Sequence, residues 1–85
     1  MPTAEKFRTA LLTWMDEAAR ASKVYVDINS GDLHRIVGGY PGQDHRMPVC
    51  CSVMEAAMRD GDVIMSAPPK GRGASLTIRY KLPRP

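Results

Sequence analysis

The stretch from Ser75 to Leu82 constrains the fold most, because apolar and polar residues alternate in it without a break. One side of the stretch carries Leu76, Ile78, Tyr80 and Leu82, and the other carries Ser75, Thr77, Arg79 and Lys81. This period of two predicts a β-strand with one buried face. Residues 63–65 follow a turn signal, Asp60-Gly61-Asp62, and predict a second extended segment. Two prolines and two glycines exclude a helix or a central strand over 67–74, so we expect a hairpin around a protruding loop.

A helix is predicted near the start of the chain, where apolar residues recur at helical spacing. Thr3 is a candidate N-cap for this helix. The apolar positions are Phe7, Ala10, Leu11, Trp14, Met15 and Ala18. The charged residues between them balance in sign, which is typical of a solvated face. Next comes the segment 24–28 (Val-Tyr-Val-Asp-Ile), whose β-branched residues at alternate positions predict a short strand.

A second helix is predicted to begin at Ser30. The Ser30 hydroxyl is a candidate N-cap, and Asp32 adds negative charge at the positive end of the helix. The apolar face of this helix is expected to consist of Leu33, Ile36 and Val37. Gly38 and Gly39 suit the conformation that ends a helix, so we expect the chain to turn there.

A third helix is predicted to begin between Asp44 and Pro48, because proline is tolerated only in the first turn of a helix. It extends to Arg59. Its buried stripe is expected to contain Cys50, Val53, Met54, Ala57 and Met58. Its opposite face is expected to contain Pro48, Ser52, Glu55, Ala56 and Arg59, which leaves that face free to meet a partner.

The length of 85 residues is enough for a single domain with one core, so we expect residues 1–85 to form one domain with a frayed tail over 83–85. The matching period of two predicts that the strand at 24–28 pairs with the strand at 76–82. One shared core is expected to hold Leu11, Trp14, Leu33, Ile36, Val53, Met54, Ile78 and Tyr80.

Composition excludes several classes of protein. The longest apolar runs fall far short of the roughly 20 residues that span a bilayer, and the N-terminus lacks the pattern of a signal peptide. The two cysteines are sequence neighbours and provide no disulfide framework. We therefore expect a cytoplasmic protein without membrane contact. The net charge is +3, and residues 63–85 carry five basic side chains and no acidic one, so an electrostatic partner should meet the C-terminal part.

The order of helix, short strand, helix, turn, helix and hairpin resembles the winged helix-turn-helix superfamily over nearly the whole chain. The resemblance rests on element order and length, without a diagnostic motif. It implies an α+β fold of three helices and a small three-stranded antiparallel sheet. The segment Pro48–Arg59 would be the recognition helix and Lys70–Gly73 a basic wing loop. Together with the charge asymmetry, this predicts a small nucleic-acid-binding module with double-stranded DNA as its partner.

The candidate nucleic-acid contacts are Arg35, Arg46, Ser52, Arg59, Lys70, Arg72, Arg79 and Lys81. Arg46 stands at the start of the third helix and could reach a guanine edge or a phosphate. Lys70 and Arg72 stand in the loop, where they suit the phosphates beside a groove. Two alternatives remain open. The basic hairpin residues could be solvated charges that protect an edge strand, or the domain could bind a protein in a larger complex or a homodimer without binding DNA.

No catalytic or metal site is expected. Adjacent cysteines on a helix point about 100° apart, so Cys50 and Cys51 do not reproduce the C-x2-C knuckle of structural zinc sites, and His34 and His45 do not complete a ligand set. Cys50 is expected in the core, and Cys51 at the edge of the buried stripe as a candidate reactive thiol. A cysteine nucleophile with either histidine as base lacks a third, orienting group, so we expect neither enzyme activity nor a cofactor.

Overall fold

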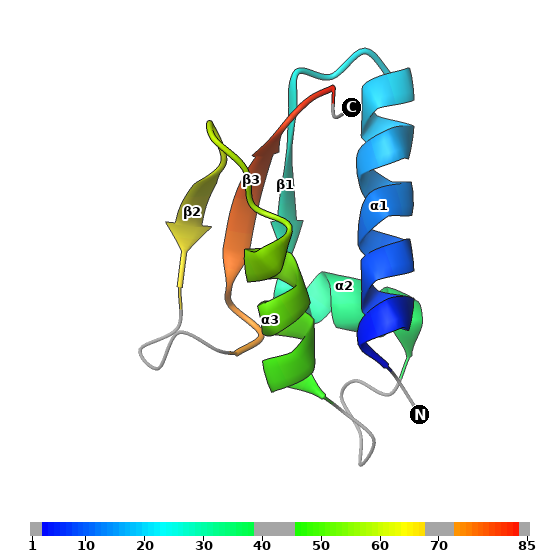
Figure 1. Ribbon diagram of the computed structural model, residues 1–85, viewed down its shortest axis with the longest axis vertical. Helices are drawn as coiled ribbons and strands as arrows, with labels where there is room; N and C mark the ends of the chain where they lie inside the picture. Colours follow the sequence, from blue (N-terminus) through cyan, green and yellow to red (C-terminus); the bar gives the residue numbers. More distant parts are fainter. Residues whose placement is uncertain (1–2, 39–45, 68–72, 84–85) are drawn as a thin grey trace.

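The computed structural model describes residues 3–38, 46–67 and 73–83, and these form three helices and three strands in an α+β fold (Figure 1). The elements are α1 (Ala4–Arg20), β1 (Tyr25–Asn29), α2 (Ser30–Val37), α3 (Met47–Ala56), β2 (Val63–Ser66) and β3 (Thr77–Lys81). The fold class and the order of elements expected from the sequence are confirmed at this level. Parts of the expected turn, loop and tail lie outside the described residues, namely 39–45, 68–72 and 84–85.

The three strands form one antiparallel sheet in the order β1-β3-β2, so the last strand in the chain is the middle strand. Ile28 of β1 and Ile64 of β2 both lie opposite Ile78 of β3. The predicted pairing of the segment 24–28 with the strand at 76–82 is therefore confirmed. A register irregularity between Ile64 and Ser66 interrupts the β2–β3 ladder.

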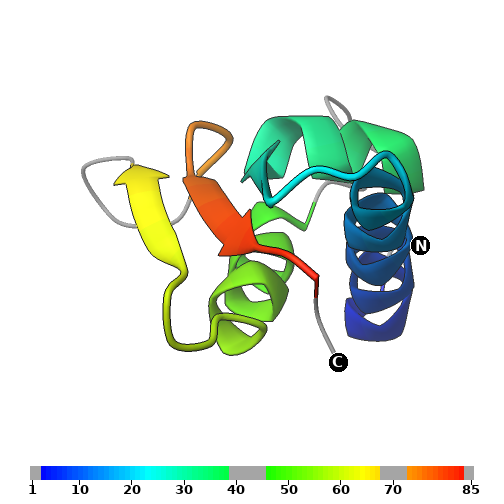
Figure 2. The same cartoon turned by 90° about the horizontal axis from the view of Figure 1, so that it is seen from above.

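The core lies between the helices and the inner face of the sheet. The alternating residues Leu76, Ile78, Tyr80 and Leu82 are buried, and so are Phe7, Leu11, Met15 and Ala18 of α1. The three helices contact one another in every pairwise combination. Figures 1 and 2 show α1 at the opposite side of the molecule from β2. The buried part of the sheet is therefore its β1–β3 portion, and the four residues of β2 are all exposed.

Three details of the helices differ from the sequence-based predictions. Ile36 is 63% exposed rather than part of the core, because it lies at the end of α2 where no described element covers it. Trp14 is only partly buried at the rim of the core. In addition, α3 ends at Ala56 and not at Arg59, and the backbone N–H of Arg59 instead donates to the Asp62 carboxylate at 2.8 Å.

The cap of α2 also differs. Asn29 is the N-cap, and its side-chain oxygen accepts from the backbone N–H of Asp32 at 3.1 Å. Ser30 lies within the first turn, where its backbone N–H donates to Leu76 O at 2.8 Å and its hydroxyl donates to Gly73 O. Ser30 therefore holds two parts of the chain together instead of capping the helix.

Candidate nucleic-acid interface

The first turn of α2 is fixed to the chain segment that leads into β3. Besides the two Ser30 bonds, the backbone N–H of Gly31 donates to Ala74 O at 3.2 Å. A Cβ atom on Gly31 would lie 3.1 Å from that same carbonyl oxygen, so the close approach favours glycine there. This corner, formed by Ser30, Gly31 and the carbonyls of Gly73 and Ala74, sets where the connection between β2 and β3 returns to the body of the domain.

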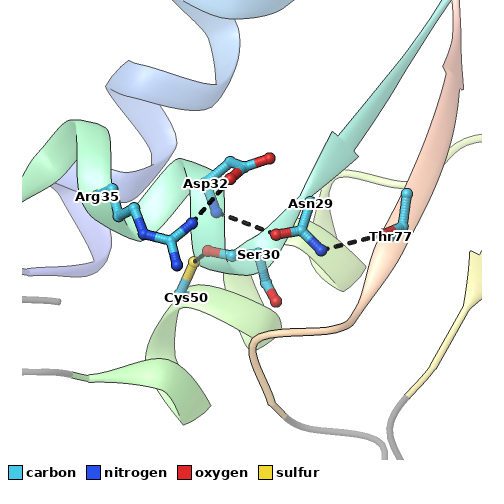
Figure 3. Close-up of polar contacts among 6 residues, drawn as sticks. All are labelled: Asn29, Ser30, Asp32, Arg35, Cys50 and Thr77. Carbon is cyan, nitrogen blue, oxygen red and sulfur yellow. Dashed lines mark hydrogen bonds and ion pairs between the residues drawn. The ribbon is translucent and has the colours of Figure 1, made fainter. Parts of the chain in front are cut away.

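The two cysteines attach α3 to the same corner. The Cys51 thiol donates to Gly73 O at 3.5 Å. The Cys50 thiol donates to Ser30 O at 3.6 Å (Figure 3). Both side chains are fully buried. The prediction that Cys51 lies at the edge of the buried stripe is wrong, because the segment before β3 covers it. Burial raises the pKa of Cys50 to about 12, which keeps that thiol protonated and unreactive as a nucleophile.

Arg35 lies on the exposed side of α2. Its guanidinium forms an ion pair of 3.0 Å with Asp32 one turn earlier, and both side chains are more than half exposed (Figure 3). Asn29, which caps this turn, also donates from its amide to Thr77 Oγ1 of β3 at 3.2 Å. An ion pair this exposed contributes only about 0–1 kcal/mol, so it does not prevent Arg35 from reaching an anion.

Arg46 precedes α3 and is half-buried there. Its backbone N–H donates to Nε2 of His34 at 2.7 Å, which requires that nitrogen to be unprotonated. His34 is fully buried on α2, and its ring packs edge-on against Phe7 at a centroid distance of 4.8 Å. The histidine thus fixes the start of α3 against α1 and α2. No sequence pattern indicated this structural role.

Ser52 lies on α3, and Arg59 follows the end of that helix. Ser52 is half-buried in the helix, whereas Arg59 is exposed beyond the helix end. Arg59 also borders a groove between α1 and α3 that is otherwise lined mainly by apolar side chains, with Arg8 on the α1 side. Arg46 and Arg59 therefore stand just beyond opposite ends of α3.

Arg79 and Lys81 lie on the other face of the sheet. Tyr80, between them, points inward and donates from its hydroxyl to Met54 O of α3, so its two neighbours point away from α3. The Arg79 guanidinium makes two bonds to the Asp27 carboxylate, at 2.8 and 3.0 Å. It also stacks 4.1 Å from the centre of the Tyr25 ring.

This bidentate contact lowers the pKa of Asp27, chiefly through the hydrogen bond from Arg79. Sequence patterns did not identify Asp27 as the acid that neutralises Arg79, because only the register of β1 against β3 brings the two residues together. Asp27 lies directly opposite Arg79 in the β1–β3 ladder.

The eight candidates consequently do not share one surface. Arg46, Ser52 and Arg59 accompany α3, and Arg35 lies on the neighbouring α2. Arg79 and Lys81 lie on the sheet face turned away from α3. Lys70 and Arg72 lie outside the described residues.

Within residues 3–38, 46–67 and 73–83, no group of three or more His, Cys, Asp or Glu side chains could hold a metal ion. In those ranges, too, no helix has the length and apolar character needed to cross a membrane. No protein-family model, curated protein or solved structure matches the chain.

Proposed function

We propose that the chain is a winged-helix module that binds double-stranded DNA, with α3 as the helix that approaches the major groove and the β2–β3 connection as the wing. The element order and the sheet order β1-β3-β2 support this proposal, because a winged helix places its first strand beside the last one. The observation that carries it is the corner at Gly73. There α2, α3 and the end of the β2–β3 connection are joined by hydrogen bonds, which would hold a recognition helix and a wing at a constant separation.

The charges suit a partner with regularly spaced phosphates. Arg46 and Arg59 flank α3, and Arg35 lies on α2. Lys70 and Arg72 belong by sequence to the β2–β3 connection. Each lysine or arginine that meets a phosphate releases condensed counterions, and this favours binding at low salt. The exposed face of α3 carries Pro48 and Ala56 rather than several Asn, Gln or Arg side chains, so binding is expected to depend more on the backbone than on base sequence.

The test measures the affinity for a short random-sequence DNA duplex by fluorescence anisotropy at several salt concentrations. Replacing Lys70 and Arg72 together by Ala should lower the slope of log affinity against log salt by up to about 1.8, since each phosphate contact contributes about 0.9. Replacing Arg79 and Lys81 together by Ala removes the same charge from the sheet face turned away from α3. This matched control should leave the slope nearly unchanged.

A smaller effect on sequence preference is expected at the start of α3. If Arg46 reads a guanine, Arg46→Ala should cost about 1–3 kcal/mol on the preferred duplex and much less on others. No measurable DNA binding by the wild type near 50 mM salt, where phosphate contacts contribute most, would end the nucleic-acid proposal.

One observation favours the second candidate, a protein-interaction domain that does not bind DNA. β2 is an edge strand whose residues Val63, Ile64 and Met65 are 44–51% exposed, and it contains no charged residue. Exposed apolar edges of this kind are templates for pairing with another strand. Under this alternative, binding of a protein should be insensitive to salt, and a charge introduced by Ile64→Lys should abolish it.

A further inference from the structure

One face of α1 is turned away from α3 and borders α2, which covers it only in part. Lys6, Ala10, Thr13 and Glu17 lie on this face at spacings of four, three and four residues. At 100° per residue they fall within about 60° of one another around the helix. They line two adjoining hollows between α1 and α2, and the α2 side of these hollows is formed by Val37 and Ile36. We call these six residues the α1–α2 face.

The middle of the α1–α2 face is apolar. Ile36 is 63% exposed and stands at the same hollow as Trp14, which is only partly buried. Ala10 and Thr13, which lie between Lys6 and Glu17 along α1, are small, so a second helix could approach α1 closely at this point. An exposed isoleucine beside a partly exposed tryptophan, with charges at the rim, is typical of a surface that another protein covers.

The ends of the face carry opposite charges. Lys6 stands toward the start of α1 and Glu17 toward its end, and within the described part of the chain neither side chain has an ion-pair partner. The four residues Lys6, Ala10, Thr13 and Glu17 have the same spacing when counted from either end of the helix. If a second α1 lies antiparallel across the first, Lys6 meets Glu17 of the second copy, and Ala10 meets Thr13 of the second copy.

We propose that the α1–α2 face binds the same face of a second copy of this chain, with the two α1 helices antiparallel about a two-fold axis. Such a contact is isologous, so each Lys6–Glu17 pair occurs twice. A parallel arrangement would place like charges together and is disfavoured. α1 lies at the opposite side of the molecule from β2 (Figures 1 and 2), so the contact leaves β2 uncovered.

The size of the surface sets the expected strength. α1 has 17 residues, and a helix of that length spans about 25 Å. One helix face of this length, with Ile36 added, is smaller than the roughly 800 Å² per partner of a stable complex. We therefore expect a dimer that forms reversibly at micromolar concentrations or above.

The test is sedimentation equilibrium of the full chain without nucleic acid. Wild-type protein should shift from monomer to dimer as its concentration rises. Lys6→Glu and Glu17→Lys each turn two attractive pairs into two repulsive ones, and each should weaken the dimer about tenfold, a free-energy change within the range of a few surface pairs. The double variant K6E/E17K restores opposite charges at both contacts. Its dissociation constant should return to within about twofold of the wild type.

The matched control is Arg8→Glu, which makes the same change of charge as Lys6→Glu on the same helix but on the flank that borders α3. It should leave dimerisation unchanged. All the substituted side chains are exposed, and circular dichroism checks that each variant is folded. A wild type that stays monomeric at millimolar concentration would overturn the proposal. So would single variants that dimerise normally, or a double variant as weak as the single ones. Because no DNA is present, the outcome is independent of the proposed nucleic-acid binding.

Discussion

Tyr80 joins the middle strand of the sheet to the end of α3, and Tyr80→Phe tests how much that link contributes to stability. Its side chain is fully buried, and its hydroxyl donates to Met54 O at 2.7 Å. α3 ends at Ala56, so Met54 lies in its last turn, where a helix leaves carbonyl groups without the usual partner four residues later. The N–H of Met58, four residues later, donates to Glu55 O instead. The tyrosine hydroxyl therefore satisfies a carbonyl that the helix leaves open.

Phenylalanine keeps the ring and removes only the oxygen. The expected loss combines the net contribution of one hydrogen bond, about 1 kcal/mol, with the cost of leaving a buried carbonyl unsatisfied, and amounts to about 1–2 kcal/mol. A chain of this size is expected to have a free energy of unfolding near 5 kcal/mol, so the change is a large share of it. The melting temperature should fall by roughly 4 to 16 °C, at about 4–8 °C per kcal/mol for a domain of this size.

The measurement is urea unfolding followed by circular dichroism, with the slopes compared to show that both proteins unfold alike. Tyr25→Phe is the matched control. That ring is exposed and stacks on Arg79, and phenylalanine preserves the stacking, so the free energy of unfolding should change by less than about 0.5 kcal/mol. If Tyr80→Phe were as stable as the wild type, the idea that β3 closes the end of α3 by this bond would be refuted.

Three further predictions concern the core and the ionisable groups. Leu11→Ala should cost about 2–5 kcal/mol in urea unfolding because Leu11 is fully buried, whereas Leu12→Ala at the exposed neighbouring position should cost less than about 0.5 kcal/mol; equal costs would contradict the assigned helix face. The pKa of Asp27, measured by NMR titration, should lie below its ordinary value of 3.8 and should rise when Arg79→Met removes the guanidinium. Because the pKa is depressed in the folded state, this pair stabilises the fold above about pH 4 and the contribution is lost as the pH falls through the lowered pKa; an unshifted Asp27 would contradict it. The Cys50 thiol should react with iodoacetamide, as followed by mass spectrometry at pH 8, only when the chain is unfolded in urea, since burial raises its pKa to about 12; rapid labelling of the folded protein would show that the thiol is accessible.

The elements with a clear period were predictable from the sequence. The alternation in the strand at 76–82 correctly identified its buried face, and the pairing with the segment 24–28 followed from the same pattern. Helical spacing likewise identified the buried face of α1. It failed at Ile36, because spacing shows which residues share a face but not whether another element covers it. α2 ends at Val37, and in a single copy Ile36 remains exposed.

The candidate site was less predictable, because its chemistry depends on contacts between distant segments. A count of basic residues does not reveal that Arg79 is bound by Asp27, since that contact requires the β1–β3 register. The burial of Cys51 depends on the segment that contains Gly73, and the structural role of His34 depends on the start of α3. Each of these partners belongs to a different segment of the chain from the residue it contacts, so no local sequence pattern could identify it.

The order of the strands in the sheet also has a consequence for synthesis on the ribosome. β3 lies between β1 and β2 but comes after both in the chain. When the nascent chain has emerged only as far as Ser66, β3 is still missing. β3 is the described strand with which both β1 and β2 pair in the finished sheet. Its helices can form early, because their contacts are local, whereas the sheet must wait for contacts between residues far apart in the sequence. During that interval the apolar strand β2 stays available to neighbouring nascent chains, so the emergence of Thr77–Lys81 ends the period in which misassembly competes with folding.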